Sequence, residues 1–597
     1  MLHPAPPTPT TDSPHARLRC FLAGLSLFSD LPEVTLDELA ARAESITLAG
    51  GMTLLEQGTA SDAFLVLRWG RLAAWRTGED GQTRRLGQIS PGECVGEVGL
   101  ILDQPRTATV FALRDSELVR WSRSEFEQLI AHHPTAMLRL TREALKRYAA
   151  TAHRPAEVRC IAVLPGTPGV DAVAFARRLA RALHWLGKVR VVEADEARSR
   201  SGGWFSRMEQ EAHGLIYVGD ADPAWRERCV RQSDAVLMLA DTDDKPDHVL
   251  PSPDALSPHL PLHLVLLRRD VPAAGSTHAW LEAFPGRAMH HHVIDDNDLA
   301  RCARLLGGRA TGLVLSGGGA RGFAHIGAIR ALREHRIQAD YIGGCSAGAV
   351  VGAGVAAGWD EAHLVRAMRT AFVDHDPLSD RTLPLVAMSS GRRVSRALRA
   401  MFGEHCIEDL RLPFFCVSTD LTGGRLHVHD RGSLWIALRA GSALPGLVPP
   451  VFHDHRVLVD GGVIDNLPVD EMQHRLSGAI VAVDVGGSYR LETTLEETAL
   501  PSSWLEFLRQ WRQKKYPGIG RILWRAAMVN SDANAARQRK LSSLLLRPPL
   551  AGIDLLDWKK FDQVVELGYR DTLRHLDAHP EALATAAWNP DDQAARG

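Results

Sequence analysis

The sequence predicts a multidomain α/β protein, and three observations support this prediction. With 597 residues the chain is too long for one hydrophobic core, and its 45% apolar and 23% charged residues are typical of a folded protein. Short apolar alternations come first, alternating strand and helix patterns follow, and glycine-rich turns come next. We expect a disordered tail, three domains and a helical C-terminal extension, over residues 1–16, 17–153, 154–308, 309–490 and 491–597.

The composition argues against several classes of protein. A net charge of −2 speaks against a dedicated nucleic-acid binder, which normally carries a basic surplus. No stretch reaches 18 uncharged apolar residues, so we expect no membrane-spanning helix. The N-terminal sequence MLHPAPPTPTTDSPHARLRC has no apolar segment and is not a secretory signal. Eight cysteines without CxxC spacing suggest neither a metal site nor a disulfide framework, which fits a cytoplasmic location.

The first two domains differ in their periodicity. Residues 61–75 and 82–89 give short apolar alternations between glycines, which favours a barrel or sandwich of short strands. From residue 158 onward, buried strands alternate with amphipathic helices, which indicates a parallel α/β sheet. The loop Leu164–Gly169 stands where a phosphate-binding loop would, but it lacks the Lys-Ser/Thr pair that grips nucleotide phosphates. We therefore expect the second domain to be a spacer or scaffold.

The third domain contains a candidate nucleophile, Ser346. The motif Gly344-Cys-Ser-Ala-Gly348 lies between a strand and a helix of small residues. In a G-x-S-x-G elbow, Gly344 and Gly348 are needed because side chains there would collide with neighbouring backbone. The turn places the Ser346 hydroxyl at the N-terminus of the next helix, whose dipole favours negative charge.

A glycine-rich turn, Ser316–Gly322, lies upstream of this elbow. The three consecutive glycines Gly317, Gly318 and Gly319 expose backbone N–H groups, which suits an oxyanion hole. Two alternatives remain open at this point. Gly317, Gly319 and Gly322 also fit the dinucleotide fingerprint with Asp340 as the ribose acid, although Asp340 precedes a strand, and the turn could be purely structural.

The candidate base is Asp460. It ends a strand and is followed by two glycines, in Val457-Leu-Val-Asp-Gly-Gly462. The nearest later histidine, His474, lies inside a predicted helix and is poorly placed for a triad. A Ser–Asp dyad fits better, provided that burial raises the basicity of the carboxylate.

Together these motifs resemble those of the patatin-like phospholipases. The resemblance covers about residues 311–490 and includes the segments Arg439–Gly446 and Val448–Pro450. It implies a dyad of Ser346 and Asp460, an oxyanion hole in the Gly317–Gly319 turn built on the backbone of Gly318 and Gly319, and hydrolysis of fatty-acyl esters without a metal or other required cofactor. Arg321 would orient the turn or contact a phosphate.

The first domain resembles the β-roll of cyclic-nucleotide-binding domains. The residues that carry the resemblance are Gly96, Glu97, Arg106 and Thr107. Glu97 would accept a bond from the ribose 2′-hydroxyl and Arg106 would pair with the cyclic phosphate of cAMP or cGMP. The alternative is a structural arm in which Glu97 and Arg106 form an ordinary ion pair.

This domain combination resembles the neuropathy target esterase group, which implies phospholipid or lysophospholipid substrates. Residues 504–528 interleave tryptophans with basic residues, a pattern found in helices at membrane interfaces. Two interpretations stay open: peripheral contact with the inner face of a membrane, and a helix pair packed on the catalytic domain. The sequence thus predicts a serine hydrolase acting on lipid esters at a membrane surface, with a cyclic nucleotide as its regulatory ligand. Two other functions remain open: a nucleotide-responsive scaffold with an inactive hydrolase domain, and an esterase for neutral lipids.

Overall fold

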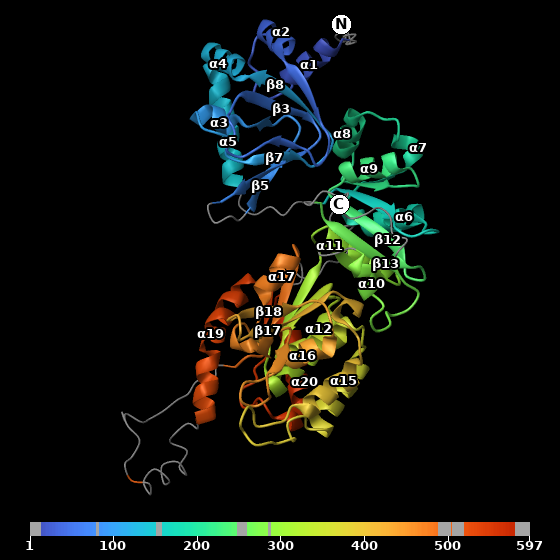
Figure 1. Cartoon of the computed structure of the whole chain (residues 1–597), viewed down its shortest axis with the longest axis vertical. Coiled ribbons are helices and arrows are strands. Elements are labelled where there is room, and N and C mark those ends of the chain that lie inside the picture. Colours follow the sequence, from blue (N-terminus) through green and yellow to red (C-terminus); the bar gives the residue numbers. More distant parts are fainter. Residues whose placement is uncertain are drawn as a thin grey trace. The chain divides into compact units, whose positions relative to one another are not determined.

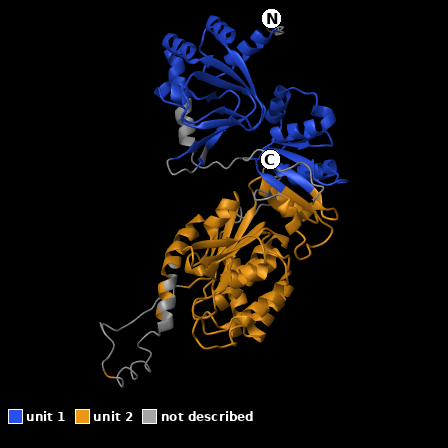
Figure 2. Cartoon of the chain, in the orientation of Figure 1, with its two compact units in different colours: residues 1–239, 250–263 blue, residues 240–249, 264–597 orange. Residues whose placement is uncertain are grey.

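The computed structural model describes residues 13–78, 83–150, 158–246, 260–283, 288–487, 503 and 519–579. The chain divides into two compact units, residues 1–239 with 250–263 and residues 240–249 with 264–597 (Figure 2). Most of the predicted tail, and residues 504–518 of the predicted basic stretch, lie outside the described residues.

The first unit begins with the expected β-roll (Figure 1). Two four-stranded sheets have the orders β1-β8-β3-β6 and β2-β7-β4-β5, with antiparallel neighbours throughout. The strands are β1 Glu44–Leu48, β2 Thr53–Leu55, β3 Ala63–Trp69, β4 Leu72–Thr77, β5 Thr83–Ile89, β6 Cys94–Val95, β7 Thr109–Ala112 and β8 Ser116–Ser122. The helices are α1 Pro14–Ala23, α2 Glu33–Arg42, α3 Glu97–Leu102, α4 Arg123–His132 and α5 Pro134–Ala150.

The middle of the chain forms a six-stranded sheet in the order β10-β11-β9-β12-β13-β14. Strands β10, β11, β9 and β12 are parallel neighbours, as the alternating pattern predicts. The strands are β9 Cys160–Pro165, β10 Val189–Val192, β11 Gly214–Val218, β12 Ala235–Asp241, β13 Leu262–Leu267 and β14 Ala288–Val293. The helices are α6 Ala172–Ala182, α7 Ala194–Ala197, α8 Gly202–Glu211, α9 Pro223–Arg231, α10 His278–Glu282 and α11 Asp296–Leu306.

Within the first unit, the β-roll and the start of this sheet are joined by buried charges. Arg114, after β7, is fully buried, and its guanidinium pairs with the carboxylates of Asp234, at 2.7 Å, and of Glu209. Arg231 of α9 pairs with Asp115 at 3.0 Å. A buried guanidinium is tolerated only when opposite charges compensate its lost hydration, so these acids hold the two folds together.

The second unit is built on an eight-stranded sheet in the order β19-β20-β17-β16-β15-β21-β22, with β18 paired to β17. Strands β17, β16, β15, β21 and β22 are parallel, whereas β18 and β20 run antiparallel to β17. The strands are β15 Thr311–Leu315, β16 Tyr341–Cys345, β17 Phe414–Asp420, β18 Arg425–His429, β19 Val451–His453, β20 Arg456–Asp460, β21 Ala479–Val483 and β22 Leu544–Leu546.

Helices cover both faces of this sheet (Figure 1). Alternate residues of β15 show the two sides: Leu313 and Leu315 pack with the apolar cluster of α12, α13 and α20, and Val314 packs with the cluster of α17. The helices are α12 Ala324–Glu334, α13 Ser346–Ala356, α14 Glu361–Met368, α15 Arg392–Phe402, α16 Leu434–Gly441, α17 Val469–Arg475, α19 Ile519–Leu541 and α20 Phe561–Ala578.

The C-terminal segment is helical, as expected, but it also contains strand β22. The sequence shows no strand pattern over about residues 500–597, yet Leu544 of β22 pairs in parallel with Val481 of β21. Helix α20 crosses α12 closely: a Cβ on Gly327 would lie 2.0 Å from the carbonyl oxygen of Val565. Because glycine lacks a side chain, the two backbones can approach, and α20 becomes part of the helical layer.

Among the described residues, no helix is both long enough and apolar enough to cross a membrane. The small-residue helix α13 is buried along almost its whole length.

Candidate active site

Ser346 stands on a tight turn between β16 and α13. Its φ of 50° is in the left-handed region, which is unusual for a residue with a side chain. A Cβ on Gly344 would lie 2.8 Å from the backbone of Ala349, and one on Gly348 would lie 2.5 Å from the carbonyl oxygens of Leu315 and Ser316. These two glycines therefore permit the turn that presents Ser346.

Asp460 reaches Ser346 through the register of the sheet. Cys345 at the end of β16 pairs with Val417 of β17, and the next residue of β17, Ser418, pairs with Asp460 at the end of β20. The two strand ends therefore lie at the same level of the sheet. Ser346 Oγ donates a hydrogen bond of 2.7 Å to Asp460 Oδ2.

The carboxylate of Asp460 is buried, with an exposed fraction of 3%. Burial raises its pKa to about 6, although bonds from Ser346 Oγ and the Gly462 backbone N–H partly offset this effect. The other oxygen, Oδ1, accepts from Gly462 N at 2.8 Å. A carboxylate with this pKa is a stronger base than an exposed aspartate and is still ionised at neutral pH.

The glycine turn lies directly beside Ser346. A Cβ on Gly317 would lie 2.9 Å from Ser346 Cβ. Among the described residues, the N–H groups of Gly318 and Gly319 have no acceptor. The N–H of Gly317 differs, because it donates to the backbone oxygen of Asn466 at 3.3 Å. Gly318 and Gly319 are thus the available donors, and Gly317 shapes the turn.

Three contacts that the motifs did not reveal fix this turn. Asn466 Nδ2 donates to the Gly317 carbonyl at 3.0 Å. Ala320 N donates to the Leu555 carbonyl at 2.8 Å, and Arg321 Nε donates to the Ile553 carbonyl at 2.7 Å. Arg321 therefore ties the turn to the C-terminal segment.

Helix α19 supports the loop that follows Asp460. The carboxylate of Asp465 accepts from Gln538 Nε2 at 2.7 Å, and Asn534 Nδ2 donates to the Ile464 carbonyl at 2.9 Å. Burial also raises the pKa of Asp465 to about 6. No sequence signal singled out these residues, because their partners lie about 70 positions away.

The dinucleotide interpretation of the glycine turn finds no support in the position of Asp340. This residue lies at the amino end of β16, where its carboxylate pairs with Arg304 at 2.6 Å and accepts from Thr311 N at 3.0 Å. A ribose-binding acid would stand at the carboxyl end of a strand. His325 is also unsuited to act as the base for Ser346. Its Nε2 contacts the Ser316 carbonyl at 2.8 Å, and burial lowers its pKa to about 4.

In the β-roll, the guanidinium of Arg106 points into the protein. It is almost fully buried and donates to the carbonyls of Gly96, at 2.7 Å, and Ala63, at 2.9 Å. It also pairs with Asp62 Oδ1 at 3.2 Å. Burial lowers the pKa of Arg106, whereas the charge of Glu97, which is buried nearby, raises it. Thr107 is half-buried.

Comparison with known protein families agrees with this architecture. Residues 313–472 match the model of the patatin-like phospholipases, and residues 46–133 match that of the cyclic nucleotide-binding domain. Residues 157–302 match the P-loop like domain of the neuropathy target esterase family. The chain therefore combines a cyclic nucleotide-binding domain, the P-loop like domain of the neuropathy target esterase family and a patatin-like phospholipase domain. In the P-loop like domain, the loop after β9 packs against β12, with Gly166 N donating to the Leu239 carbonyl at 2.7 Å.

Individual relatives match most of the length of this chain. Patatin-like phospholipase domain-containing protein 7 of Rattus norvegicus is 29% identical over 87% of this chain and 44% of its own length. Lysophospholipase NTE1 of Candida albicans is 28% identical over 88% of this chain and 46% of its own. The chain thus spans about half the length of these curated relatives. An uncharacterised NTE family protein of Mycobacterium tuberculosis is 29% identical over 95% of this chain and 97% of its own length.

Two solved structures each match less than a quarter of this chain. The regulatory domain of Toxoplasma gondii PKA with cAMP is 20% identical, covering 22% of this chain and 50% of that chain, with a TM-score of 0.21. The N-terminal domain of a transcriptional regulator from Streptomyces coelicolor is 29% identical, covering 23% of this chain and 99% of that chain, with a TM-score of 0.19.

Proposed function

We propose that this chain is a carboxylic ester hydrolase that cleaves fatty-acyl esters of lipids. The observation that carries the proposal is the 2.7 Å hydrogen bond from Ser346 Oγ to the buried carboxylate of Asp460. The unengaged N–H groups of Gly318 and Gly319 beside this pair support it, because they can stabilise a negative oxygen.

The proposed reaction runs through an acyl-enzyme. Ser346 Oγ attacks the carbonyl carbon while its proton passes to Asp460, and the oxyanion accepts bonds from Gly318 and Gly319. Collapse breaks the ester C–O bond, and Asp460 returns the proton to the leaving alcohol. Water then attacks the acyl group and gives a proton to Asp460. Release of the fatty acid restores the hydroxyl of Ser346.

Phospholipids and lysophospholipids are the proposed substrates, because relatives that match 87% and 88% of this chain are named a patatin-like phospholipase domain-containing protein and a lysophospholipase. A fluorophosphonate probe should label Ser346, and a substrate panel should show hydrolysis of lysophosphatidylcholine. If the probe labels Ser346 but the protein hydrolyses only neutral lipids, the neutral-lipid esterase is favoured. An unreactive Ser346 would favour the scaffold with an inactive hydrolase domain.

Replacing Asn466 by alanine is expected to lower kcat about 10- to 100-fold, because the glycine turn loses its side-chain anchor and the two N–H donors shift. The loss should appear in kcat more than in KM, since the donors contact the oxyanion. Asn466→Asp keeps the shape but removes the donor, so it should be equally impaired. A change confined to KM would contradict this positioning role.

An exposed apolar segment supports action at a membrane surface. Leu383, Leu385, Val386 and Met388 are 77%, 89%, 66% and 58% exposed. The loop Ala443–Gly446 connects this segment to Asp460: Met388 N donates to the Gly446 carbonyl, and Asp460 N donates to the Ala443 carbonyl. The next helix, α15, exposes four arginines, Arg392, Arg393, Arg396 and Arg399. Apolar insertion beside basic charge suits an anionic bilayer.

The double variant Leu385→Ser/Val386→Ser should bind anionic vesicles about 10-fold more weakly, because two apolar side chains leave the lipid. Hydrolysis of a lysophospholipid in those vesicles should fall in parallel, while hydrolysis of a water-soluble short-chain ester stays unchanged. Val271→Ser, at another exposed apolar residue, serves as the control. Equal vesicle binding by the double variant and wild type would count against this segment as the docking surface.

We also propose that cAMP or cGMP binds the β-roll and regulates hydrolysis. A cyclic phosphate would have to replace a protein acceptor of Arg106, and Asp62 is the exposed one. Asp62→Asn is therefore expected to tighten cyclic-nucleotide binding several-fold, because an amide competes less strongly for the guanidinium. Calorimetric titration of the full chain measures this. Absence of binding by both proteins would support the structural-arm alternative.

A further inference from the structure

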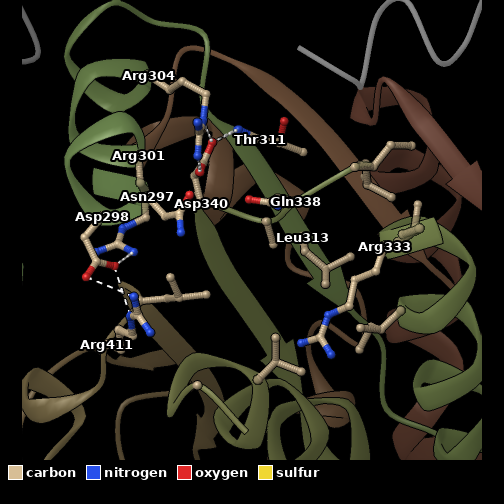
Figure 3. Close-up of a pocket in the computed structure, with 18 of the residues that line it drawn as sticks. Asn297, Asp298, Arg301, Arg304, Thr311, Leu313, Arg333, Gln338, Asp340 and Arg411 are labelled. Atoms are coloured by element: carbon tan, nitrogen blue, oxygen red, sulfur yellow. Dashed lines mark hydrogen bonds and ion pairs between the residues drawn. The ribbon is translucent and has the colours of Figure 1, made fainter. Parts of the chain in front are cut away.

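The second unit contains a cavity of about 400 Å³ outside the dyad (Figure 3). It lies at the amino edge of the parallel strands, with Thr311 of β15 and Asp340, just before β16, on its wall. Ser346 follows the opposite end of β16, a strand of five residues that spans roughly 16 Å at about 3.3 Å per residue. The cavity is therefore separate from the proposed catalytic site.

One side of the cavity is charged. Four arginines and two aspartates line it, so its walls carry a positive excess. Asp340 pairs with Arg304 at 2.6 Å, and Asp298 pairs with Arg301 at 2.6 Å and with Arg411 at 3.0 Å. Figure 3 shows these pairs together, with Arg333 reaching in from the opposite side. Among the described residues, Arg333 has no counter-ion.

The remaining wall is apolar. Its side chains come from α12, the loop before β16, β15 and the end of α13: Ile329, Leu332, Ile337, Leu313, Val355 and Trp359. Ile329, Leu332 and Arg333 lie three and four positions apart on α12, so one helix face presents both the apolar wall and the unpaired charge. An inorganic anion would leave this apolar surface in contact with water.

We propose that this cavity binds a single acyl chain that ends in an anion, with the anion at Arg333 and the chain along the apolar wall. A volume of about 400 Å³ is at the small end of ligand pockets, which suits one chain and not a two-chain phospholipid. The assignment of the ligand as a fatty acid rests on the proposed function, because that reaction releases one. Helix α13 begins at Ser346 and ends at the cavity wall, so the ligand contacts the element that carries the nucleophile.

Equilibrium binding of radiolabelled oleate to the full chain tests the proposal, after treatment with a fluorophosphonate that blocks Ser346. Arg333→Gln should weaken oleate binding about 10-fold or more, because a bond between two charged groups is lost. Ala339→Phe should also abolish it, because Ala339 lines the cavity and the larger ring fills it. Arg366→Gln, at an exposed arginine of α14 outside the cavity, should bind like wild type.

Two further probes complete the experiment: oleyl alcohol, which is neutral, and lysophosphatidate, which carries a phosphate. Oleyl alcohol should bind weakly and equally to wild type and Arg333→Gln, since it lacks the anion. Unchanged oleate affinity in Arg333→Gln or Ala339→Phe would overturn the site, and tighter binding of lysophosphatidate than of oleate would overturn the fatty-acid assignment. If the probe fails to label Ser346, the same comparison on untreated protein decides the cavity independently of the proposed function.

Discussion

Ser346→Ala is expected to lower kcat for ester hydrolysis by about 10⁴-fold or more, because no other group can form the acyl-enzyme. The bond to Asp460 Oδ2 disappears, but the Gly462 N–H still satisfies the other carboxylate oxygen, so the fold should persist. Turnover of lysophosphatidylcholine and labelling by a fluorophosphonate measure the loss. Circular dichroism and Tm confirm that the variant is folded.

Ser346→Gly is the matched control. At a φ of 50°, alanine keeps the strain of the turn, whereas glycine removes it. The glycine variant should therefore be more stable than the alanine variant by about 1 kcal/mol and equally inactive. Wild-type-like hydrolysis by either variant would disprove the role of Ser346.

The local motifs explain why both members of the proposed dyad could be named from the sequence. Each lies in a short pattern, a strand followed by a glycine-bounded turn, so neighbouring residues alone indicate Ser346 and Asp460. Their 2.7 Å contact joins positions 114 residues apart and depends on the register of β16, β17 and β20. No local pattern encodes a register between strands that are distant in sequence.

The supporting contacts could not be predicted for a related reason. Leu555 and Ile553 contribute only their carbonyl oxygens to the glycine turn, and every residue has a carbonyl. Strand β22 has three residues, too few to show a period of two. The inward position of Arg106 likewise depends on its contacts with Asp62 and Ala63, which are distant in sequence. The motif around Gly96 and Arg106 therefore predicts where Arg106 lies in the β-roll, but not the direction of its guanidinium.

Asp460→Asn is expected to abolish hydrolysis, because an amide cannot accept the proton of Ser346 at neutral pH. In the wild type, kcat/KM should fall as the pH drops below about 6, where Asp460 becomes protonated. Asp465→Asn is the matched control: Asp465 has the same raised pKa but bonds Gln538 instead of Ser346. It should lose less than about 10-fold in kcat and keep the acid limb. An acid limb near pH 4 in wild type would contradict the buried-base mechanism.

The substitution Asp460→Asn should also make the protein more stable at neutral pH. The folded pKa of Asp460, about 6, exceeds its ordinary value of 3.8, so the folded state binds the proton more tightly than the unfolded state. Ionising Asp460 in the folded protein therefore costs up to about 3 kcal/mol above pH 6, and the cost fades below about pH 4, where both states are protonated. Denaturant unfolding should show Asp460→Asn more stable than wild type at pH 8, with the difference shrinking toward pH 4. Burial of the Asp460 carboxylate would thus increase its basicity and lower the free energy of unfolding at neutral pH. An Asp460→Asn variant that is less stable than wild type at pH 8 would rule this out.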